Sequence, residues 1–213
     1  MKILITDDHA VVRQGLKQIL AAEFKQAEFG EASNAQECVR RVTENQWDVV
    51  ILDVTMPGRS GLEALKDIKQ LRPKLPVLML SMHPEDQFAV RMLKAGASGY
   101  MTKESAPEEL VGAVRKAISG GRYVSPALAE KMAGYLSIDV QTPPQERLSD
   151  REFLVLRMIA SGKTVGVIAK ELSLSVKTIS TYRTRILEKT SMANNAELTH
   201  YAIQNNLVEK SAT

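Results

Sequence analysis

The sequence predicts an α/β domain with a doubly wound, five-stranded parallel sheet, followed by an all-α domain of four helices. Over roughly the first 120 residues, short apolar runs alternate with helical segments. This alternation is typical of a parallel sheet with helices on both faces. Beyond Pro143-Pro144 the pattern is helical only. At 213 residues, the chain is also longer than most single domains.

The first domain's strands are short, mostly apolar runs bounded by polar or turn residues. We expect strands at 2–6, 27–31, 49–52, 77–80 and 99–102. Helices are expected between them at 11–22, 35–44, 61–70, 84–95 and 106–118, and Gly120-Gly121 ends the last one. The sequence therefore places this domain at residues 1–121.

Residues 122–146 are predicted to connect the two domains. A short helix is expected at 125–136. Residues 137–146 contain turn residues and a proline pair but no helical period, which indicates a linker. The second domain is then expected at residues 147–213.

In the second domain, the first helix begins at a capping box formed by Ser149 and Glu152 and ends at Gly162. Further helices are expected at 165–172, at 176–189 with Ser175 as the cap, and at 194–205. Because a tight turn joins two short helices here, the sequence predicts a helix-turn-helix.

Carboxylates follow two of the predicted strands of the first domain. Asp7 and Asp8 come directly after the first strand, and Asp53 ends the third. Open α/β sheets place their sites at the carboxyl ends of strands. Clustered carboxylates repel one another and suit Mg²⁺, which prefers oxygen ligands. For Asp7 and Asp8 taken alone, a helix cap or a turn is the competing interpretation.

A hydroxyl and an ammonium are expected at the same edge. Ser81 ends the fourth strand and Lys103 ends the fifth. Together with Mg²⁺ they would complement a tetrahedral anion on Asp53, because the cations neutralise its oxygens and the hydroxyl donates a hydrogen bond. His9 follows the acidic pair, and a structural or orienting role is favoured over metal binding.

The third helix of the second domain has two different faces. Its apolar face is predicted to pack on the core through Val176, Ile179 and Ile186. The other face is a polar stripe with flanking cations: Lys177, Ser180, Thr181, Thr184 and Glu188, with Arg183, Arg185 and Lys189. Hydroxyls between cations suit a DNA groove between two phosphate walls. An ordinary solvated helix face is the competing interpretation.

Charge is distributed unevenly along the chain. Residues 1–146 hold 18 Lys and Arg against 19 Asp and Glu, whereas residues 147–213 hold 10 against 6. A basic excess on the smaller domain favours nucleic acid as its partner. The single cysteine, Cys38, excludes an internal disulfide and suits a reducing cytosol. With no membrane span or signal peptide expected, we predict a cytoplasmic protein that has no membrane partner.

The ordered set in the first domain resembles a response-regulator receiver domain, which has a flavodoxin-like fold. The set comprises Asp7-Asp8, Asp53 before Met56-Pro57-Gly58, Ser81, Tyr100 and Lys103. The resemblance implies that Asp53 is the phospho-acceptor. It also implies that Asp8, Asp53 and the Thr55 carbonyl bind Mg²⁺, with Asp7 nearby or acting through water. Tyr100 would be the switch aromatic, and Glu104 stands where many receivers have proline.

The second domain resembles the LuxR-type helix-turn-helix, with signature stretches at 148–152 and 175–179. The combination is typical of the NarL/FixJ class of response regulators. By position, base contacts would come from Ser180, Thr181 and Thr184, and phosphate contacts from Lys177, Thr178, Arg183 and Arg185. Val165-Gly166-Val167 departs from the polar stretch common at this place, so more of the binding is left to the third helix.

The resemblance implies a phosphorylation-controlled transcription regulator. A histidine kinase would phosphorylate Asp53, and the protein would dimerise on promoter DNA without being an enzyme in its own right. One alternative is a DNA-binding regulator that acts independently of phosphorylation. Another is a phosphatase or phosphotransferase with Asp53 as nucleophile, but no second acid/base residue at a suitable spacing supports it.

Overall fold

The computed structural model describes residues 1–82, 87–126, 128–130, 144–205 and 207–208. The chain divides into two compact units, Met1–Ser137 and Ile138–Thr213. Each unit is described by itself.

The amino-terminal unit is built on a five-stranded sheet of order β2-β1-β3-β4-β5, in which all neighbours are parallel. The strands are β1 (Lys2–Thr6), β2 (Glu28–Ala32), β3 (Val49–Asp53), β4 (Val77–Ser81) and β5 (Gly99–Thr102). Every residue of β3 and β4 is buried, which explains their continuously apolar sequences. The predicted doubly wound parallel sheet is confirmed.

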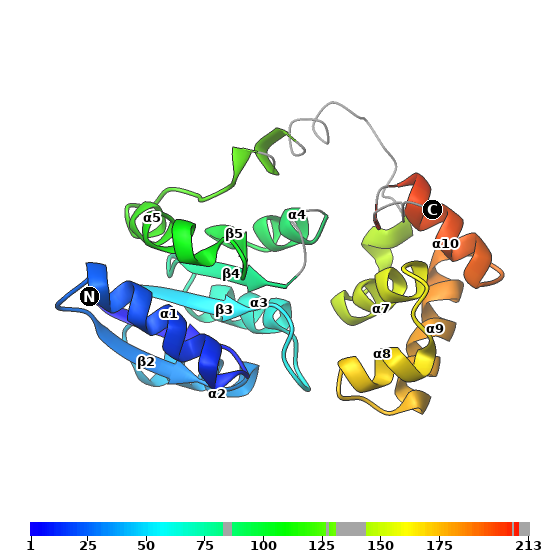
Figure 1. Ribbon diagram of the computed structural model, residues 1–213, viewed down its shortest axis with the longest axis horizontal. Helices are drawn as coiled ribbons and strands as arrows, with labels where there is room; N and C mark the ends of the chain where they lie inside the picture. Colours follow the sequence, from blue (N-terminus) through cyan, green and yellow to red (C-terminus); the bar gives the residue numbers. More distant parts are fainter. Residues whose placement is uncertain (83–86, 127, 131–143, 206, 209–213) are drawn as a thin grey trace. The chain divides into compact units, whose positions relative to one another are not determined.

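Helices cover both faces of this sheet (Figure 1). They are α1 (Ala10–Glu23), α2 (Ala35–Glu44), α3 (Gly61–Leu71), α4 (Gln87–Lys94) and α5 (Ala106–Ile118). One core cluster joins Leu16 and Leu20 of α1 and Leu110 and Val114 of α5 to alternate residues of the strands, among them Ile51. Helices α2 and α3 pack against each other. The start of the predicted helix at 84–95 lies outside the described residues.

The first residues of α3 contact the backbone at the end of β3 directly. Ser60 and Glu63 form a capping box, and the Gly61 amide donates to the Val54 carbonyl at 3.0 Å. A Cβ atom at position 61 would lie 2.0 Å from the carbonyl oxygen of Asp53. Only glycine therefore permits this close approach beside Asp53.

The carboxyl-terminal unit is helical. It consists of a 3₁₀ turn η1 (Pro144–Arg147) followed by α7 (Asp150–Ala160), α8 (Val165–Glu171), α9 (Val176–Thr190) and α10 (Asn195–Gln204). The predicted capping box of Ser149 and Glu152 is present, and Gly162 has a positive φ of 80° after α7. Helix α7 packs against both α9 and α10, and α8 packs against α9.

The structure changes two predictions about this unit. Val176 is 56% exposed, so its assignment to the core is wrong, whereas Ile179 and Ile186 are fully buried. Val176 is the first residue of α9, at the end of the helix rather than over its packed centre. Gln145, predicted to lie in a linker, is buried in η1 and accepts a hydrogen bond from the Tyr201 hydroxyl.

The predicted helix at 125–136 lies largely outside the described residues. Pro126 and residues 128–130 are helical. Leu128 is fully buried, and its amide hydrogen-bonds the Ser125 hydroxyl at 3.2 Å.

Candidate functional site

Asp53 lies at the carboxyl end of the central strand β3. Its side chain is almost completely buried, and the Thr55 amide donates to its Oδ1 at 3.3 Å. Burial raises the pKa of Asp53 to about 6, with a further contribution from the nearby Asp7 carboxylate, while Lys103 acts in the opposite direction. A carboxylate with this pKa is largely ionised at neutral pH and is thus available as a nucleophile.

Lys103 connects two of the predicted carboxylates. Its Nζ lies 2.7 Å from Asp7 Oδ2 and 3.0 Å from Asp53 Oδ2. The Lys103 amide donates to the Ser81 carbonyl at 2.7 Å, which fixes the start of the side chain beside β4. Burial alone would lower the pKa of Lys103, but Asp53 and Asp7 outweigh it and raise that pKa. Lys103 is therefore an internal counter-ion for both carboxylates.

The acidic pair Asp7-Asp8 follows β1, which pairs with β3 so that Thr6 lies opposite Leu52. Asp7 is fully buried and accepts a hydrogen bond from the His9 amide at 2.8 Å. The His9 ring Nδ1 lies 2.9 Å from Asp8 Oδ1 and 3.3 Å from Asp7 Oδ1. The N-cap of α1 is His9, so neither Asp7 nor Asp8 caps that helix, whereas the contact with the His9 amide makes Asp7 a turn residue.

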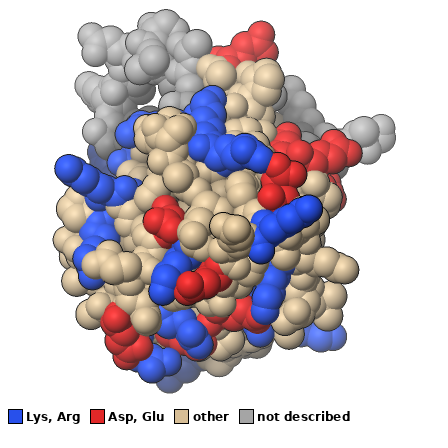
Figure 2. Space-filling model, turned by 90° about the vertical axis from the view of Figure 1, so that its left-hand side faces the viewer, with Lys and Arg blue, Asp and Glu red and all other residues tan. Residues whose placement is uncertain are grey.

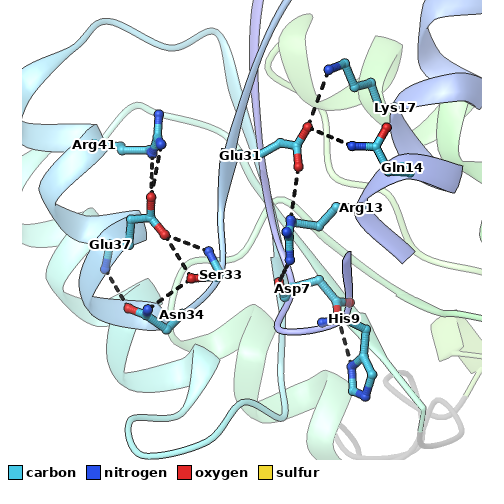
Figure 3. Close-up of polar contacts among 10 residues, drawn as sticks. All are labelled: Asp7, His9, Arg13, Gln14, Lys17, Glu31, Ser33, Asn34, Glu37 and Arg41. Atoms are coloured by element: carbon cyan, nitrogen blue, oxygen red, sulfur yellow. Dashed lines mark hydrogen bonds and ion pairs between the residues drawn. The ribbon is translucent and has the colours of Figure 1, made fainter. Parts of the chain in front are cut away.

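Arg13 was not singled out by the sequence analysis but holds the acidic loop in place (Figure 3). Its Nη1 donates to the Asp7 carbonyl at 2.8 Å, and its Nε donates to Glu31 Oε2 at 3.1 Å. Gln14 and Lys17 also contact Glu31, and the Arg13 guanidinium is the main cause of a lowered pKa for that carboxyl. The signal available in the sequence was the position of Arg13, one helical turn after His9.

The donor atoms at this edge fit a hard divalent cation. Oxygen or nitrogen atoms of Asp7, Asp8 and His9 lie within 4.8 Å of one another. Asp7 and Asp53 share one ammonium, that of Lys103, and Asp8 adds a third carboxyl group close to Asp7. Receiver domains generally bind Mg²⁺ at such an acidic site, and carboxylate oxygens are the ligands that Mg²⁺ prefers.

Ser81 and Tyr100 lie on the neighbouring strands β4 and β5. Ser81 pairs with Thr102, one residue before Lys103. Both Ser81 and Tyr100 are fully buried. The structure thus brings Asp7, Asp53 and Lys103 into direct contact, with Ser81 at the same edge and Tyr100 inside the core.

The predicted DNA-contacting residues lie on or near the exposed side of α9. Lys177, Ser180, Thr181, Thr184 and Arg185 are exposed, and Thr178 and Arg183 are half-buried. The hydroxyls of Thr181 and Thr184 donate to the carbonyls of Lys177 and Ser180 at 3.0 and 3.2 Å. Each hydroxyl oxygen keeps acceptor capacity, and both threonines are exposed residues.

Two of the flanking cations are already engaged within the unit. Arg183 Nε donates to Asn195 Oδ1 at 2.7 Å, at the start of α10. Lys189 Nζ lies 2.6 Å from Glu152 Oε2, which ties the end of α9 to the start of α7. Lys177 and Arg185 are consequently the more available cations of this helix.

Family models match both units. Residues 3–115 match the response regulator receiver domain, and residues 146–202 match the luxR family of bacterial regulatory proteins. No helix of the described residues has the length and apolar character needed to cross a membrane.

Curated relatives align over nearly the whole chain. The response regulator GacA of Pseudomonas syringae pv. syringae (strain B728a) is 38% identical over 213 residues, covering 100% of both chains. The response regulator UvrY of Escherichia coli (strain K12) is 36% identical over 208 residues, covering 97% of this chain and 95% of that protein.

Solved structures show the same architecture. The RcsB–DNA complex is 28% identical, with a TM-score of 0.58 and coverage of 94% of this chain and 96% of that one. RcsB from Salmonella enterica serovar Typhimurium, bound to the promoter P1flhDC in the presence of the phosphomimetic BeF₃⁻, is 26% identical, with a TM-score of 0.58 and coverage of 98% and 99%. The chain therefore belongs to the two-component response regulators of the NarL/FixJ class, transcription regulators that join a receiver domain to a LuxR-type DNA-binding domain.

Proposed function

We propose that Asp53 accepts a phosphoryl group from a histidine kinase and that this modification controls promoter binding by the carboxyl-terminal unit. The observation that carries the proposal is the contact of Asp53 with Lys103 Nζ at 3.0 Å, at the buried end of β3. This contact places an ionisable nucleophile beside a cation that can neutralise an incoming phosphoryl group.

The proposed transfer needs little from the protein besides position and charge. A carboxylate oxygen of Asp53 attacks phosphorus as the P–N bond of the phosphohistidine breaks, and the leaving imidazole takes up a proton. Asp8, Asp53 and the Thr55 carbonyl would hold Mg²⁺, with Asp7 nearby. This ion would supply charge neutralisation that Lys103 alone leaves incomplete. The chain is otherwise a regulator rather than an enzyme.

Ser81 and Tyr100 are proposed to report the modification. Ser81 would donate its hydroxyl to a phosphoryl oxygen, and Lys103 would contact another oxygen. Tyr100, which is fully buried on the neighbouring strand β5, would follow the movement of Ser81. Phosphorylation would then favour a homodimer by shifting the population between two conformations.

Promoter recognition is assigned to α9. Ser180, Thr181 and Thr184 would meet base edges in the major groove. The backbone phosphates would be contacted by Lys177, Thr178, Arg183 and Arg185. Two copies of this helix in a homodimer would bind two half-sites spaced by the DNA helical repeat. The domain limits proposed for this division of labour are 1–121, 122–146 and 147–213, and the proposed location is the cytoplasm.

The test combines acetyl-phosphate labelling with footprinting on genomic DNA. Wild-type protein should gain acid-labile phosphate with Mg²⁺ and bind its promoters more tightly, whereas Asp53→Asn should do neither. Asp48→Asn is the matched control, because Asp48 is an exposed carboxylate just before β3. Undiminished labelling of Asp53→Asn would overturn the acceptor assignment. Loss of labelling with unchanged promoter occupancy would instead favour a phosphorylation-independent regulator.

A further inference from the structure

The receiver domain contains a cavity of about 980 Å³ at the amino-terminal ends of its strands, whereas Asp53 lies at the carboxyl-terminal end of β3. Asp48, Pro76 and Ser98, which directly precede β3, β4 and β5, line it. The carboxyl-terminal ends of α3 and α5 contribute Leu71 and Ile118. The residues proposed for phosphoryl transfer do not line this cavity, so it is separate from that site.

The cavity lining is strongly basic. It contains four cations, Lys69, Arg72, Lys74 and Arg122, and a single carboxylate, Asp48. Asp48 already accepts a hydrogen bond from the Lys2 amide at 2.6 Å. Residues 1–121 as a whole hold 16 Lys and Arg against 16 Asp and Glu, so this concentration of cations is local. Figure 2 shows the molecule from the side at which the amino terminus lies in Figure 1, with Lys and Arg scattered across that face and Asp and Glu between them.

Three of these cations make no polar side-chain contact within the described part of the chain. These are Arg72, Lys74 and Arg122, for which the structure shows neither an ion pair nor a side-chain hydrogen bond. Lys69 differs, because its Nζ donates to the Leu75 carbonyl at 2.7 Å. Burial, and then repulsion by Arg122, lower the pKa of Lys69. The like charges around the cavity are therefore not balanced from within the domain.

Helix dipoles account for only part of this pattern. Cations near the carboxyl ends of helices are favourable, since they interact with the last carbonyl groups. Arg72 and Arg122 follow α3 and α5, but their guanidinium groups donate to no carbonyl in the described residues. A group of unpaired cations around one hollow instead matches a ligand that brings several negative charges.

The cavity also offers apolar surface for the rest of such a ligand. Leu71 and Ile118 are 50% and 40% exposed, although both are large apolar residues. Trp47 lies in the same lining, and its indole N–H is already used by the Arg41 carbonyl at 2.9 Å. The volume lies within the range typical of pockets for small molecules.

We propose that this cavity binds a small phosphorylated ligand of about nucleotide size, through Arg72, Lys74 and Arg122. The phosphates would contact the unpaired cations, and the organic part would lie against the apolar lining. Since Arg presents a planar set of donors, Arg72 and Arg122 are expected to contribute most to the affinity. The site would give the receiver a second input, independent of Asp53.

The experiment uses the full chain and its only tryptophan, Trp47, which lines the cavity and reports on it directly. Fluorescence excited at the red edge of the indole band is titrated in EDTA with ATP, tripolyphosphate and adenosine. ATP should give a saturable change that weakens with salt. Arg72→Gln and Arg122→Gln should each weaken the apparent affinity about tenfold, as expected for a lost charge-assisted hydrogen bond. Lys25→Gln removes an exposed cation outside the lining and should leave the affinity unchanged.

Each of the other possible results either supports or overturns the proposal. Tripolyphosphate binding as tightly as ATP supports the site and identifies phosphate as the part recognised. The proposal is overturned if adenosine binds as tightly as ATP. It is also overturned if neither ATP nor tripolyphosphate gives a saturable signal. Equal ATP affinity in wild type and in a double Arg72→Gln, Arg122→Gln variant also overturns it. Circular dichroism of each variant confirms that the fold is intact before affinities are compared.

Discussion

The raised pKa of Asp53 predicts that replacing it with Asn stabilises the metal-free receiver at neutral pH. Its pKa rises from 3.8 to about 6 in the folded chain, so folding favours the protonated carboxyl. The stabilising contribution of that proton is complete below pH 3.8 and disappears as the pH rises through 6. Above this window the buried carboxylate costs on the order of 3 kcal/mol relative to an exposed one.

The asparagine side chain that replaces Asp53 is neutral at every pH and has nearly the same shape. We therefore expect the difference in unfolding free energy, variant minus wild type, to grow with pH. Between pH 5 and pH 8 it should increase by about 1.4 kcal/mol, because roughly half of the total is already present at pH 5. The increase between the two pH values tests the reasoning better than the difference at a single pH. Loss of the Lys103 contact in the variant changes the unfolding free energy by a nearly constant amount at every pH, and this amount cancels in the increase.

Urea unfolding in EDTA, followed by Trp47 fluorescence, measures this difference. Trp47 is the only tryptophan and lies in the receiver, so the signal reports on that domain. Glu104→Gln is the control: it removes an exposed carboxylate next to Lys103, and its effect should stay within about 0.5 kcal/mol at each pH. A difference for Asp53→Asn that is constant or shrinks with pH would refute the reasoning. Added Mg²⁺ should stabilise the wild type and narrow the gap.

Three further predictions concern Lys103, α9 and α8. Lys103→Ala leaves two buried carboxylates without their ammonium and should cost about 3–5 kcal/mol in urea unfolding at pH 7.5. In sedimentation, the same variant should show residual phosphorylation that no longer drives dimerisation. Normal phosphate-driven association would contradict that role of Lys103. In duplex titrations at several salt concentrations, Lys177→Ala should make the salt slope shallower by roughly one on all sequences. Thr184→Ala should instead leave the slope unchanged and cost about 1–3 kcal/mol at one contacted base pair; equal weakening on specific and scrambled duplexes would count against that contact. Gly166→Ala should stabilise the carboxyl-terminal unit by up to about 1 kcal/mol in thermal unfolding, because a Cβ there meets no atom within 4 Å; a lowered midpoint would show that the glycine has another role.

Much of the fold could be predicted because its local signals agree with its tertiary structure. The continuously apolar run before Asp53 became a strand buried at every residue, and the capping box at Ser149 starts α7 as expected. Periodicity was less informative at the ends of elements. Val176 continues the apolar spacing of α9, yet it is exposed because it is the first residue of the helix. Gln145 follows a proline pair that suggested a linker, yet it is buried and accepts a hydrogen bond from Tyr201, 56 residues away.

The candidate site shows a similar division. The ends of β1, β3 and β5 could be assigned from sequence, so Asp7, Asp53 and Lys103 could be placed at one edge. The bridging of both carboxylates by one ammonium depends on the path of the side chain and is visible only in the structure. Arg13 was missed because a polar residue in the first turns of a helix is common. Its contact to the Asp7 carbonyl connects residues that no motif links.

The contacts around Asp53 reconcile two requirements of a phospho-acceptor. A nucleophile gains reactivity when it is shielded from water, but burial disfavours the charged form that reacts. Lys103 acts against that cost, while Asp7 adds to it, and the resulting pKa of about 6 leaves Asp53 mostly ionised at neutral pH. Lys103 is shared with Asp7, so its one ammonium does not neutralise the whole negative charge of the two carboxylates. A second cation bound at this edge can neutralise the charge that remains. The same shortage of positive charge that destabilises the metal-free receiver thus makes the site suited to Mg²⁺ and to phosphoryl transfer.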